Sequence, residues 1–469
     1  MIFSSVIFLF YFLPIVLAAY FLLGKRCRNA VLLIASIIFY AWGEPKLVLI
    51  LGLSVVVNYL FGMALLSEAT AVRKAVVTGA VIFNIGILFL YKYLDFSITV
   101  INDTLRFLRS DQTLPLVGLA LPIGLSFFTF QGLSYVIDVY RKKVPVQKNP
   151  MHVALYISMF PQLVAGPIVR YETIEREITA RTVTLNDVYE GAQRFILGLG
   201  KKVLIADVLA YPADLIFDGG LDQLTTSKAW LGVLCYTLQI YFDFSGYSDM
   251  AIGLGRIFGF HYLENFDYPY TTTSITGFWR KWHISLSSWF RDYLYIPMGG
   301  NRRGNVYLHL IVVFLCTGIW HGAAFTFLFW GIWHGAFILA ERILKQKGIT
   351  PKLPAAVGWL YTMLVVSIGW MFFRVDTLRH GISYLWTLFG KSADGFIQYT
   401  LPYYLTPKVA VVFLVGTLAS LGVFRRIYEK TKHLRGFEWM YQIFLLVVLF
   451  FSITSVVNGN YSPFIYFRF

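Results

Sequence analysis

Two histidines in the central third of the chain stand among residues that make an ionisable side chain costly. His283 lies in the run Phe278–Tyr293, which is dense in tryptophan and cations, and His321 lies in Thr317–Gly322, inside a long apolar stretch. An ionisable group at bilayer depth costs roughly 2–3 kcal/mol or more, so its presence there indicates a function. The chemistry that an imidazole offers in such a place is proton transfer.

His321 stands between Trp320 and Gly322. The glycine permits a close backbone approach or a helix end, and the tryptophan supplies a flat wall. A neutral imidazole there can take a proton from an attacking hydroxyl, because its pKa lies near the operating pH. The alternative is a histidine bonded to a neighbouring carbonyl for packing, and the residues alone favour neither interpretation.

His283 has cations beside it at Arg280, Lys281 and Arg291. Such cations can hold the phosphate groups of a nucleotide-bearing donor. The alternative is an interfacial helix whose cations meet lipid phosphates and whose tryptophans lie in the aromatic belt. Without further information the residues favour the interfacial helix.

Other polar motifs carry weaker signals. His334 repeats the Trp-His-Gly pattern but lies too far from His321 for a metal-ligand pair on one helix turn, so we expect a supporting role. The three cysteines show no paired spacing, and neither a disulfide framework nor a metal site is expected. Asp243 and Asp249 suit a proton relay, but two carboxylates hydrogen-bonded at a broken helix end are favoured.

The C-terminal tail has four aromatic residues among its last six, and Tyr466 carries the only hydroxyl among them. Chain ends are usually polar and frayed, so this one should be buried in a groove. A tyrosine near a base can act as a covalent nucleophile. The alternative, an aromatic anchor at the outer interface, is favoured by the residues alone.

Composition places these motifs in a membrane. Of the residues, 57% are hydrophobic and 14% charged, against about 25% charged in an average soluble protein. Apolar runs of about 20 residues, enough to cross a hydrocarbon core of about 30 Å, recur from end to end. The net charge of +15 falls mostly in short loops between these runs, where Lys and Arg set orientation and face membrane lipids, and nucleic acid is not an expected partner. We predict an all-α polytopic membrane protein forming a single domain, 1–469.

The elements that must position the histidines follow from the apolar pattern. Residues 305–320 and 323–341 predict a hairpin with both ends in the cytoplasm and His321 at its far turn. Residues 188–304 predict re-entrant structure lining a cavity, since broken helices at membrane depth need cover from protein or water. Residues 170–187 predict a charged surface loop, and 95–114 a segment along the outer surface. Further apolar segments are expected at 1–23, 29–42, 47–66, 75–94, 116–139, 354–373, 407–424 and 441–457, with the tail 458–469 outside. With the hairpin and the re-entrant segments, this gives about eleven to thirteen membrane segments.

The run Phe278–Tyr293 with Trp320-His321-Gly322 resembles the signature of the membrane-bound O-acyltransferase (MBOAT) family. The likeness extends over nearly the whole chain. Within that family the chain resembles the bacterial alginate O-acetylation branch, which includes peptidoglycan and cellulose acetylation relatives and the teichoic acid D-alanylation protein. The supporting blocks are Leu121–Phe127, Phe160–Pro167, Tyr241–Met250 and Tyr293–Arg302.

This resemblance implies a ring of about 11–13 tilted transmembrane helices, with re-entrant segments, around a central tunnel in the bacterial inner membrane. His321 takes the position of the family's essential histidine. His283 takes the second signature position, often Asn in eukaryotic branches, so an acyl-binding or polarising role is implied. The donor-binding residues would be Arg280, Lys281, Trp282, Arg291 and Trp320.

The resemblance also implies a reaction. The donor would be acetyl-CoA, with no bound cofactor, and a secreted or membrane-anchored polysaccharide O-acetyltransferase would finish the transfer to an extracytoplasmic polymer. Tyr466 resembles the tyrosine of the C-terminal aromatic motif of the small D-alanylation partner, which is thought to carry the acyl group. The competing hypotheses are a polysaccharide-precursor transporter or flippase without acyl transfer, and a polymer acyltransferase that needs no partner. The polymer itself stays open among alginate, cellulose, peptidoglycan and another exopolysaccharide.

Overall fold

The computed structural model describes residues 1–469 except 165, 350–353, 394, 460 and 464–469. Every regular element within the described residues is a helix, which confirms the all-α prediction. The chain folds as two compact units, Met1–Ala192 with Ala251–Leu263 and Gln193–Met250 with Glu264–Phe469. Two long helices, α10 (Leu185–Gly200) and α12 (Thr226–Ile257), contribute residues to both. That these units act as the single domain expected from the sequence stays a prediction.

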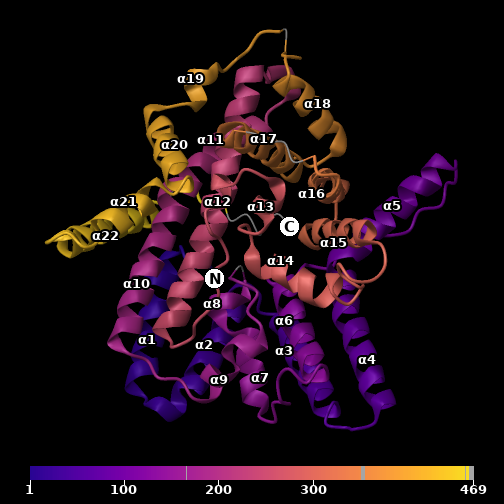
Figure 1. The fold of residues 1–469 in the computed structure, drawn as a ribbon, viewed down its shortest axis with the longest axis vertical. Helices are drawn as coiled ribbons and strands as arrows, with labels where there is room; N and C mark the ends of the chain where they lie inside the picture. The colour runs from indigo at the N-terminus through magenta and orange to yellow at the C-terminus, as the bar shows by residue number, and fades with distance from the viewer. Residues whose placement is uncertain (165, 350–353, 394, 460, 464–469) are drawn as a thin grey trace. The chain divides into compact units, whose positions relative to one another are not determined.

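The first unit consists of helices, most of them apolar (Figure 1). Its helices are η1 (Phe8–Phe12), α1 (Leu13–Leu22), η2 (Lys25–Cys27), α2 (Arg28–Gly43), α3 (Val48–Ala64), α4 (Thr70–Leu88), η3 (Phe89–Tyr93), α5 (Leu94–Phe107), α6 (Leu125–Tyr140), α7 (Pro150–Ser158), α8 (Phe160–Leu163) and α9 (Tyr171–Thr179). The guanidinium of Arg73 ties three of them together, because it donates to the carbonyl oxygens of Leu65 at 2.5 Å and Tyr140 at 2.8 Å.

Two expectations for this unit were wrong in their boundaries. Residues 95–107 do not form a separate surface segment, because α4, η3 and α5 run on without a break over 38 residues. At 1.5 Å per residue such a helix is about 57 Å long and must extend past a hydrocarbon core of about 30 Å; Figure 1 shows α5 reaching beyond the other helices of this unit. The span expected from residue 116 starts later, since α6 begins only after Gly124, whose φ is +76°.

The charged stretch 170–187 was expected to be a loop and contains a helix instead. In α9 the side chains of Tyr171, Ile174 and Ile178 are buried. Their spacing of three and four residues places them on one helix face. The charges on the other face hid this short apolar stripe from the sequence pattern.

The second unit carries the residues with candidate chemistry. Its helices, besides its part of α10 and α12, are η4 (Lys201–Ala206), α11 (Asp207–Phe217), η5 (Leu221–Gln223), η6 (Pro269–Thr271), α13 (Ile275–Trp279), α14 (Ile284–Phe290), η7 (Arg291–Tyr295), α15 (Val306–His321), α16 (Phe325–Gln346), α17 (Ala355–Arg374), α18 (Leu378–Leu388), α19 (Leu401–Tyr404), α20 (Pro407–Ser420), α21 (Val423–Thr431) and α22 (Phe437–Val457). The expected hairpin around His321 is confirmed, as α15 and α16 pack along each other. The short helices α13, α14 and η7 agree with the expected broken segments.

The broken helix end expected at Asp243 and Asp249 is wrong, because α12 continues through both residues. Each carboxylate is neutralised by a cation instead. Asp243 pairs with Lys202 at 2.9 Å, and Asp249 pairs with Lys201 at 2.5 Å and with Arg194 at 2.6 Å. Paired in this way, the carboxylates do not require the helix to open.

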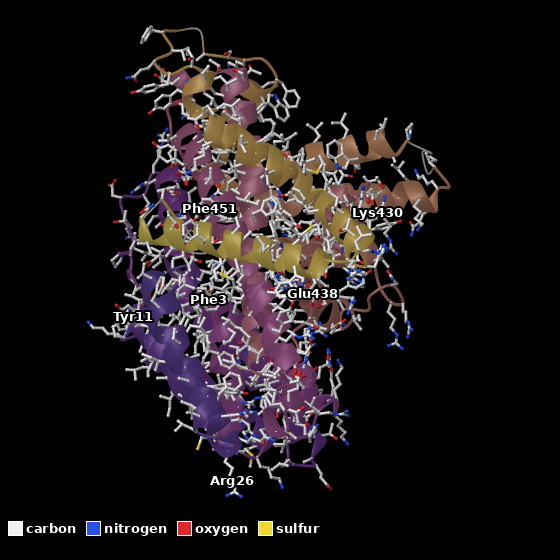
Figure 2. The ribbon with its side chains drawn as sticks, turned by 90° about the vertical axis from the view of Figure 1, so that its left-hand side faces the viewer. Phe3, Tyr11, Arg26, Lys430, Glu438 and Phe451 are labelled. Carbon is white, nitrogen blue, oxygen red and sulfur yellow. The ribbon has the colours of Figure 1, made fainter. Side chains whose placement is uncertain are left out.

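Four helical stretches in the described residues are long and apolar enough to cross a membrane, and α20 with α21 forms a fifth, bent by 63°. The four are Thr70–Phe107, Phe325–Gln346, Ala355–Arg374 and Phe437–Val457. On α22 the side chains point outward as lipid-facing residues do: Phe450 and Phe451 are 65% and 56% exposed, and Figure 2 labels Phe451 on that helix. Ala355–Arg374 differs, because most of its apolar residues are buried within the protein. Because other apolar helices are shorter, among them Val48–Ala64 and Val306–His321, the total of eleven to thirteen segments stays a prediction, as do the ring and the tunnel.

Candidate active site

A tight turn between α13 and α14 positions His283. The turn follows a capped helix, since the Ser274 hydroxyl accepts from the Gly277 amide at 3.0 Å. His283 itself has φ +44° and ψ +56°, in the left-handed region. Residues other than glycine occupy that region rarely, and such strain is concentrated at functional sites.

The side chain of Asn265 fixes the orientation of the His283 imidazole. Asn265 Oδ1 lies 3.0 Å from His283 Nδ1 and also accepts from the Ser285 hydroxyl at 2.9 Å, while its Nδ2 donates to Ser248 at 3.0 Å. An oxygen that accepts from its neighbours requires Nδ1 to carry the proton. In the neutral imidazole Nε2 is then the acceptor, and it is buried without a hydrogen-bond partner in the described residues. His283 therefore presents a lone pair.

Two glycines let the α15–α16 hairpin close tightly behind His321, the last residue of α15. A Cβ on Gly318 would collide with the carbonyl oxygen of Phe327, and one on Gly331 would collide with that of Phe314. The helices thus cross backbone to backbone, so the end of α15 is held firmly against α16. This close approach determines where the His321 ring lies.

Aromatic rings surround His321. Its imidazole centroid lies 5.0 Å from the Trp320 ring, 5.1 Å from Trp330 and 5.1 Å from Phe373 of α17. The residue is 7% exposed. The Trp320 ring also lies 6.1 Å from the His283 ring. The two histidines singled out separately in the sequence thus meet at one indole.

His334 extends the cluster. Its ring lies 5.1 Å from Trp330 and 5.1 Å from Trp279, and it is fully buried. Neither of its nitrogens, nor the indole nitrogen of Trp279 or Trp330, has a hydrogen-bond partner in the described part of the chain. Most buried polar groups do have one, so these nitrogens are available to a polar molecule that enters the cluster.

The predicted donor-binding residues divide into two groups. Trp282 and Trp320 belong to the aromatic cluster, Trp282 at 4.7 Å from the Trp370 ring. The cations lie elsewhere. Arg280 is exposed, and Lys281 pairs with Asp267 at 3.3 Å.

Arg291 lies outside the helices suited to span and is 61% exposed. Its hydrogen bond to Asp292 at 2.7 Å raises the pKa of the guanidinium. The side chains of Arg280, Lys281 and Arg291 are thus exposed or paired with an aspartate in the described residues. Their role in donor binding stays a prediction, and Tyr466 lies outside the residues that the structure describes.

Two positioning residues were not predicted from the sequence. One is Asn265, and the other is Glu341 of α16, whose carboxylate accepts from the Ile275 amide at 2.7 Å and from the Thr276 amide at 2.9 Å and hydroxyl at 2.6 Å. It thereby anchors the start of α13. An acidic residue at the end of an apolar helix with basic flanks was the available signal for Glu341, whereas nothing in the sequence connects Asn265 to His283.

Comparison with known proteins adds to this geometry. Residues 74–375 match the model of the MBOAT, membrane-bound O-acyltransferase family. The chain is 40% identical to the probable alginate O-acetylase AlgI of Pseudomonas putida over 100% of both chains. It is 31% identical to the peptidoglycan O-acetyltransferase of Helicobacter pylori over 100% of this chain and 98% of that one. A teichoic acid D-alanyltransferase of Bacillus subtilis is 31% identical over 43% of this chain and 54% of its own.

Proposed function

This chain belongs to the membrane-bound O-acyltransferase family, and from that premise we propose that it moves acetyl groups from cytoplasmic acetyl-CoA to an extracytoplasmic polysaccharide. The names of two full-length relatives, an alginate O-acetylase and a peptidoglycan O-acetyltransferase, support acetyl as the group and a polysaccharide as the acceptor. The enzyme would act as a multi-pass protein of the bacterial inner membrane. A secreted or membrane-anchored partner would complete the transfer.

The observation that carries the proposal is the meeting of His283 and His321 at Trp320, with ring centroids 6.1 and 5.0 Å away. A general base works best where water is excluded and its orientation is fixed. Burial among aromatic rings excludes water from both imidazoles, the glycine crossing holds the end of α15 at His321, and Asn265 fixes the tautomer of His283. A polysaccharide transporter has no evident use for such a pair.

The proposed first step is acyl transfer to Tyr466. The phenolic oxygen attacks the carbonyl carbon of the thioester, His321 takes the phenolic proton, and the carbon–sulfur bond breaks. The proton then passes to the departing CoA thiolate, which leaves acetyl-tyrosine and CoA. The indole N–H groups of Trp279 and Trp330 would donate to the carbonyl oxygen as it gains charge, and the His283 Nε2 lone pair would orient the acyl donor.

The proposed second step transfers the acetyl group to the acceptor and regenerates free Tyr466. A hydroxyl of the partner or of the polymer attacks the carbonyl carbon of the acetyl-tyrosine ester and loses its proton to His321. The bond between that carbon and the tyrosine oxygen breaks, the phenolate takes the proton from His321, and the acceptor leaves with the acetyl group. Acetyl-CoA is too polar to cross the bilayer, whereas an acetyl group on tyrosine is small and uncharged. Arg280, Lys281 and Arg291 would bind the CoA phosphates.

The test uses purified full-length protein and acetyl-CoA labelled in the acetyl group. We expect wild type to accumulate label on the protein. Direct passage of that label to alginate, cellulose or peptidoglycan fragments would favour the acyltransferase that needs no partner. His321→Ala should accumulate little label and Tyr466→Phe none. Labelling of His321→Ala at the wild-type rate would contradict the role of His321 as the general base. Normal acetylation of polymer by Tyr466→Phe in cells would contradict the role of Tyr466 as the acyl carrier. A protein that takes no label under any condition would favour the flippase.

A further inference from the structure

Three consecutive residues near the chain end, Tyr461–Pro463, are each bound by a charged side chain of the second unit. We call them the tail segment. The Tyr461 hydroxyl donates to Asp214 at 2.7 Å, the Ser462 side chain is hydrogen-bonded to Asp207, and Lys202 Nζ donates to the carbonyl oxygen of Pro463 at 2.5 Å. Chain ends without such ties fray, so this end is docked.

The buried ammonium of Lys202 accounts for the docking. An ammonium group has three donors, and the structure gives this one three acceptors: Asp207 at 2.7 Å, Asp243 at 2.9 Å and the Pro463 carbonyl at 2.5 Å. The side chain of Lys202 is only 1% exposed. Undocking of the tail segment would take away one of these three acceptors, so the bound tail is the state in which all three donors are satisfied within the protein.

The charges of this site also match the tail segment. One ammonium faces two buried carboxylates, which leaves an excess of acceptors, and the Ser462 side chain meets Asp207 there. The tail thus brings an acceptor to the cation and a hydroxyl to the anion. Such reciprocal pairing is what satisfies a buried polar network.

A second anchor fixes Tyr461. Its partner Asp214 is held by Arg374 at 2.6 Å, and Arg374 also pairs with Asp218 at 2.8 Å. The Tyr461 ring lies edge-on to Tyr211 at 6.0 Å between centroids. The Tyr461 hydroxyl therefore donates to a carboxylate, that of Asp214, which Arg374 already holds in place.

The docking site lies on the same helix as a wall of the candidate active site. Asp243 and Phe244 are neighbours on α12, and the Phe244 ring lies 4.5 Å from the His283 imidazole. Tyr466 follows Pro463 by three residues, which span at most about 11 Å. Whatever holds Pro463 therefore limits where Tyr466 can react.

We propose that Lys202, Asp207 and Asp243 form an internal receptor for the tail segment and are positioning residues for acyl transfer through Tyr466. The proposal rests on the acyl-carrier role of Tyr466 given above. It assigns a function to three buried charges that the chemistry at His321 does not itself use. The receptor predicts that this end of the chain is held before any acyl donor binds.

Hydrogen–deuterium exchange of the C-terminal peptide of full-length protein in detergent tests the receptor. In the triple variant Lys202→Met, Asp207→Asn, Asp243→Asn, which removes all three charges together, we expect exchange of that peptide to rise about tenfold or more. Peptides from α10 and α12 should keep their wild-type exchange. The kcat of acetyl transfer should fall while the KM for acetyl-CoA stays the same, because a misplaced nucleophile affects the step rather than donor binding.

A gentler variant keeps the test decisive where the triple variant loses its fold. Tyr461→Phe with Ser462→Ala removes two tail contacts and leaves every buried ion pair in place, so we expect several-fold faster exchange of the C-terminal peptide. Unchanged exchange in that variant, or in a folded triple variant, would overturn the receptor. Tyr466→Phe separates the two proposals, because it should abolish acetyl carriage and leave exchange at the wild-type rate. Full activity of Tyr466→Phe would contradict the acyl-carrier role of Tyr466 but would leave the docking of the tail segment in place.

Discussion

His283 and His321 lie against one indole ring, that of Trp320, at 6.1 and 5.0 Å between ring centroids. They reach it by different routes, His283 from a left-handed turn and His321 from the end of α15. Neither route tolerates much movement, since one depends on Asn265 and the other on a glycine crossing. The pair is therefore pre-organised, as the proposed acid–base site requires.

We expect His321→Ala to lower acetyl transfer by at least about 100-fold, because a positioned general base contributes roughly 10²–10⁴ in rate. The measurement is the initial rate of protein acetylation from labelled acetyl-CoA. His309→Gln is the matched control, a buried histidine on the same helix whose Nδ1 lies 3.1 Å from the carbonyl oxygen of Gly300. It should lose stability but keep turnover within about threefold; an equal loss in both variants would show that any histidine of α15 matters only for folding.

At His283 the backbone should decide which substitutions fold. Its φ of +44° suits Asn, whereas a β-branched residue in that region pays about 1–3 kcal/mol in strain. We expect His283→Asn to melt close to wild type and retain part of the activity, and His283→Val to melt several degrees lower and have none. Thermal unfolding in detergent measures the difference. Equal melting temperatures would contradict the left-handed turn.

The glycine crossing between α15 and α16 should be intolerant of a methyl group. We expect Gly318→Ala to cost about 1–3 kcal/mol and to lower kcat, because the new Cβ forces α16 away and moves His321. Gly86→Ala is the control, since a Cβ on that α4 glycine meets nothing within 4 Å. There we expect no loss and a gain of up to about 1 kcal/mol from helix propensity. The crossing would lose its importance if both variants unfolded at the wild-type temperature with full activity.

The carboxylate of Glu341 should hold the signature segment in place from a distance. It accepts two backbone amides and one hydroxyl at the start of α13, so Glu341→Ala should cost about 1.5–3 kcal/mol, the usual value for a hydrogen bond to a charged group. Glu341→Gln retains one acceptor oxygen and should lose less. Rates and unfolding temperatures of the two variants give the comparison. A Gln variant as weak as the Ala variant would mean that charge, rather than hydrogen bonding, is what matters.

Much of the fold was predictable because apolar runs have a direct physical meaning. Long runs such as those at α17 and α22 have to be helices in a bilayer, where each backbone group must be bonded within the segment. The hairpin at His321 followed from two apolar runs with basic ends. Short amphipathic pieces were missed, as at α9, because three buried side chains make a weak signal among charges.

Charges inside apolar helices led to a wrong prediction for a related reason. Asp243 and Asp249 suggested a broken helix because a carboxylate in an apolar run is costly alone. Their partners Lys202 and Arg194 lie on η4 and α10, far away in the chain. Only the packing of helices showed that these carboxylates are paired with cations.

The sequence by itself determined the class of protein and singled out two candidate histidines, since composition, apolar length and the residues around His283 and His321 are local properties. The tertiary structure alone decided that these histidines share Trp320, that Asn265 fixes the tautomer of His283, and that Lys202 binds the Pro463 carbonyl. Each of those contacts joins residues distant along the chain. Their geometry depends on how helices cross and turn, which no local pattern of residue types contains.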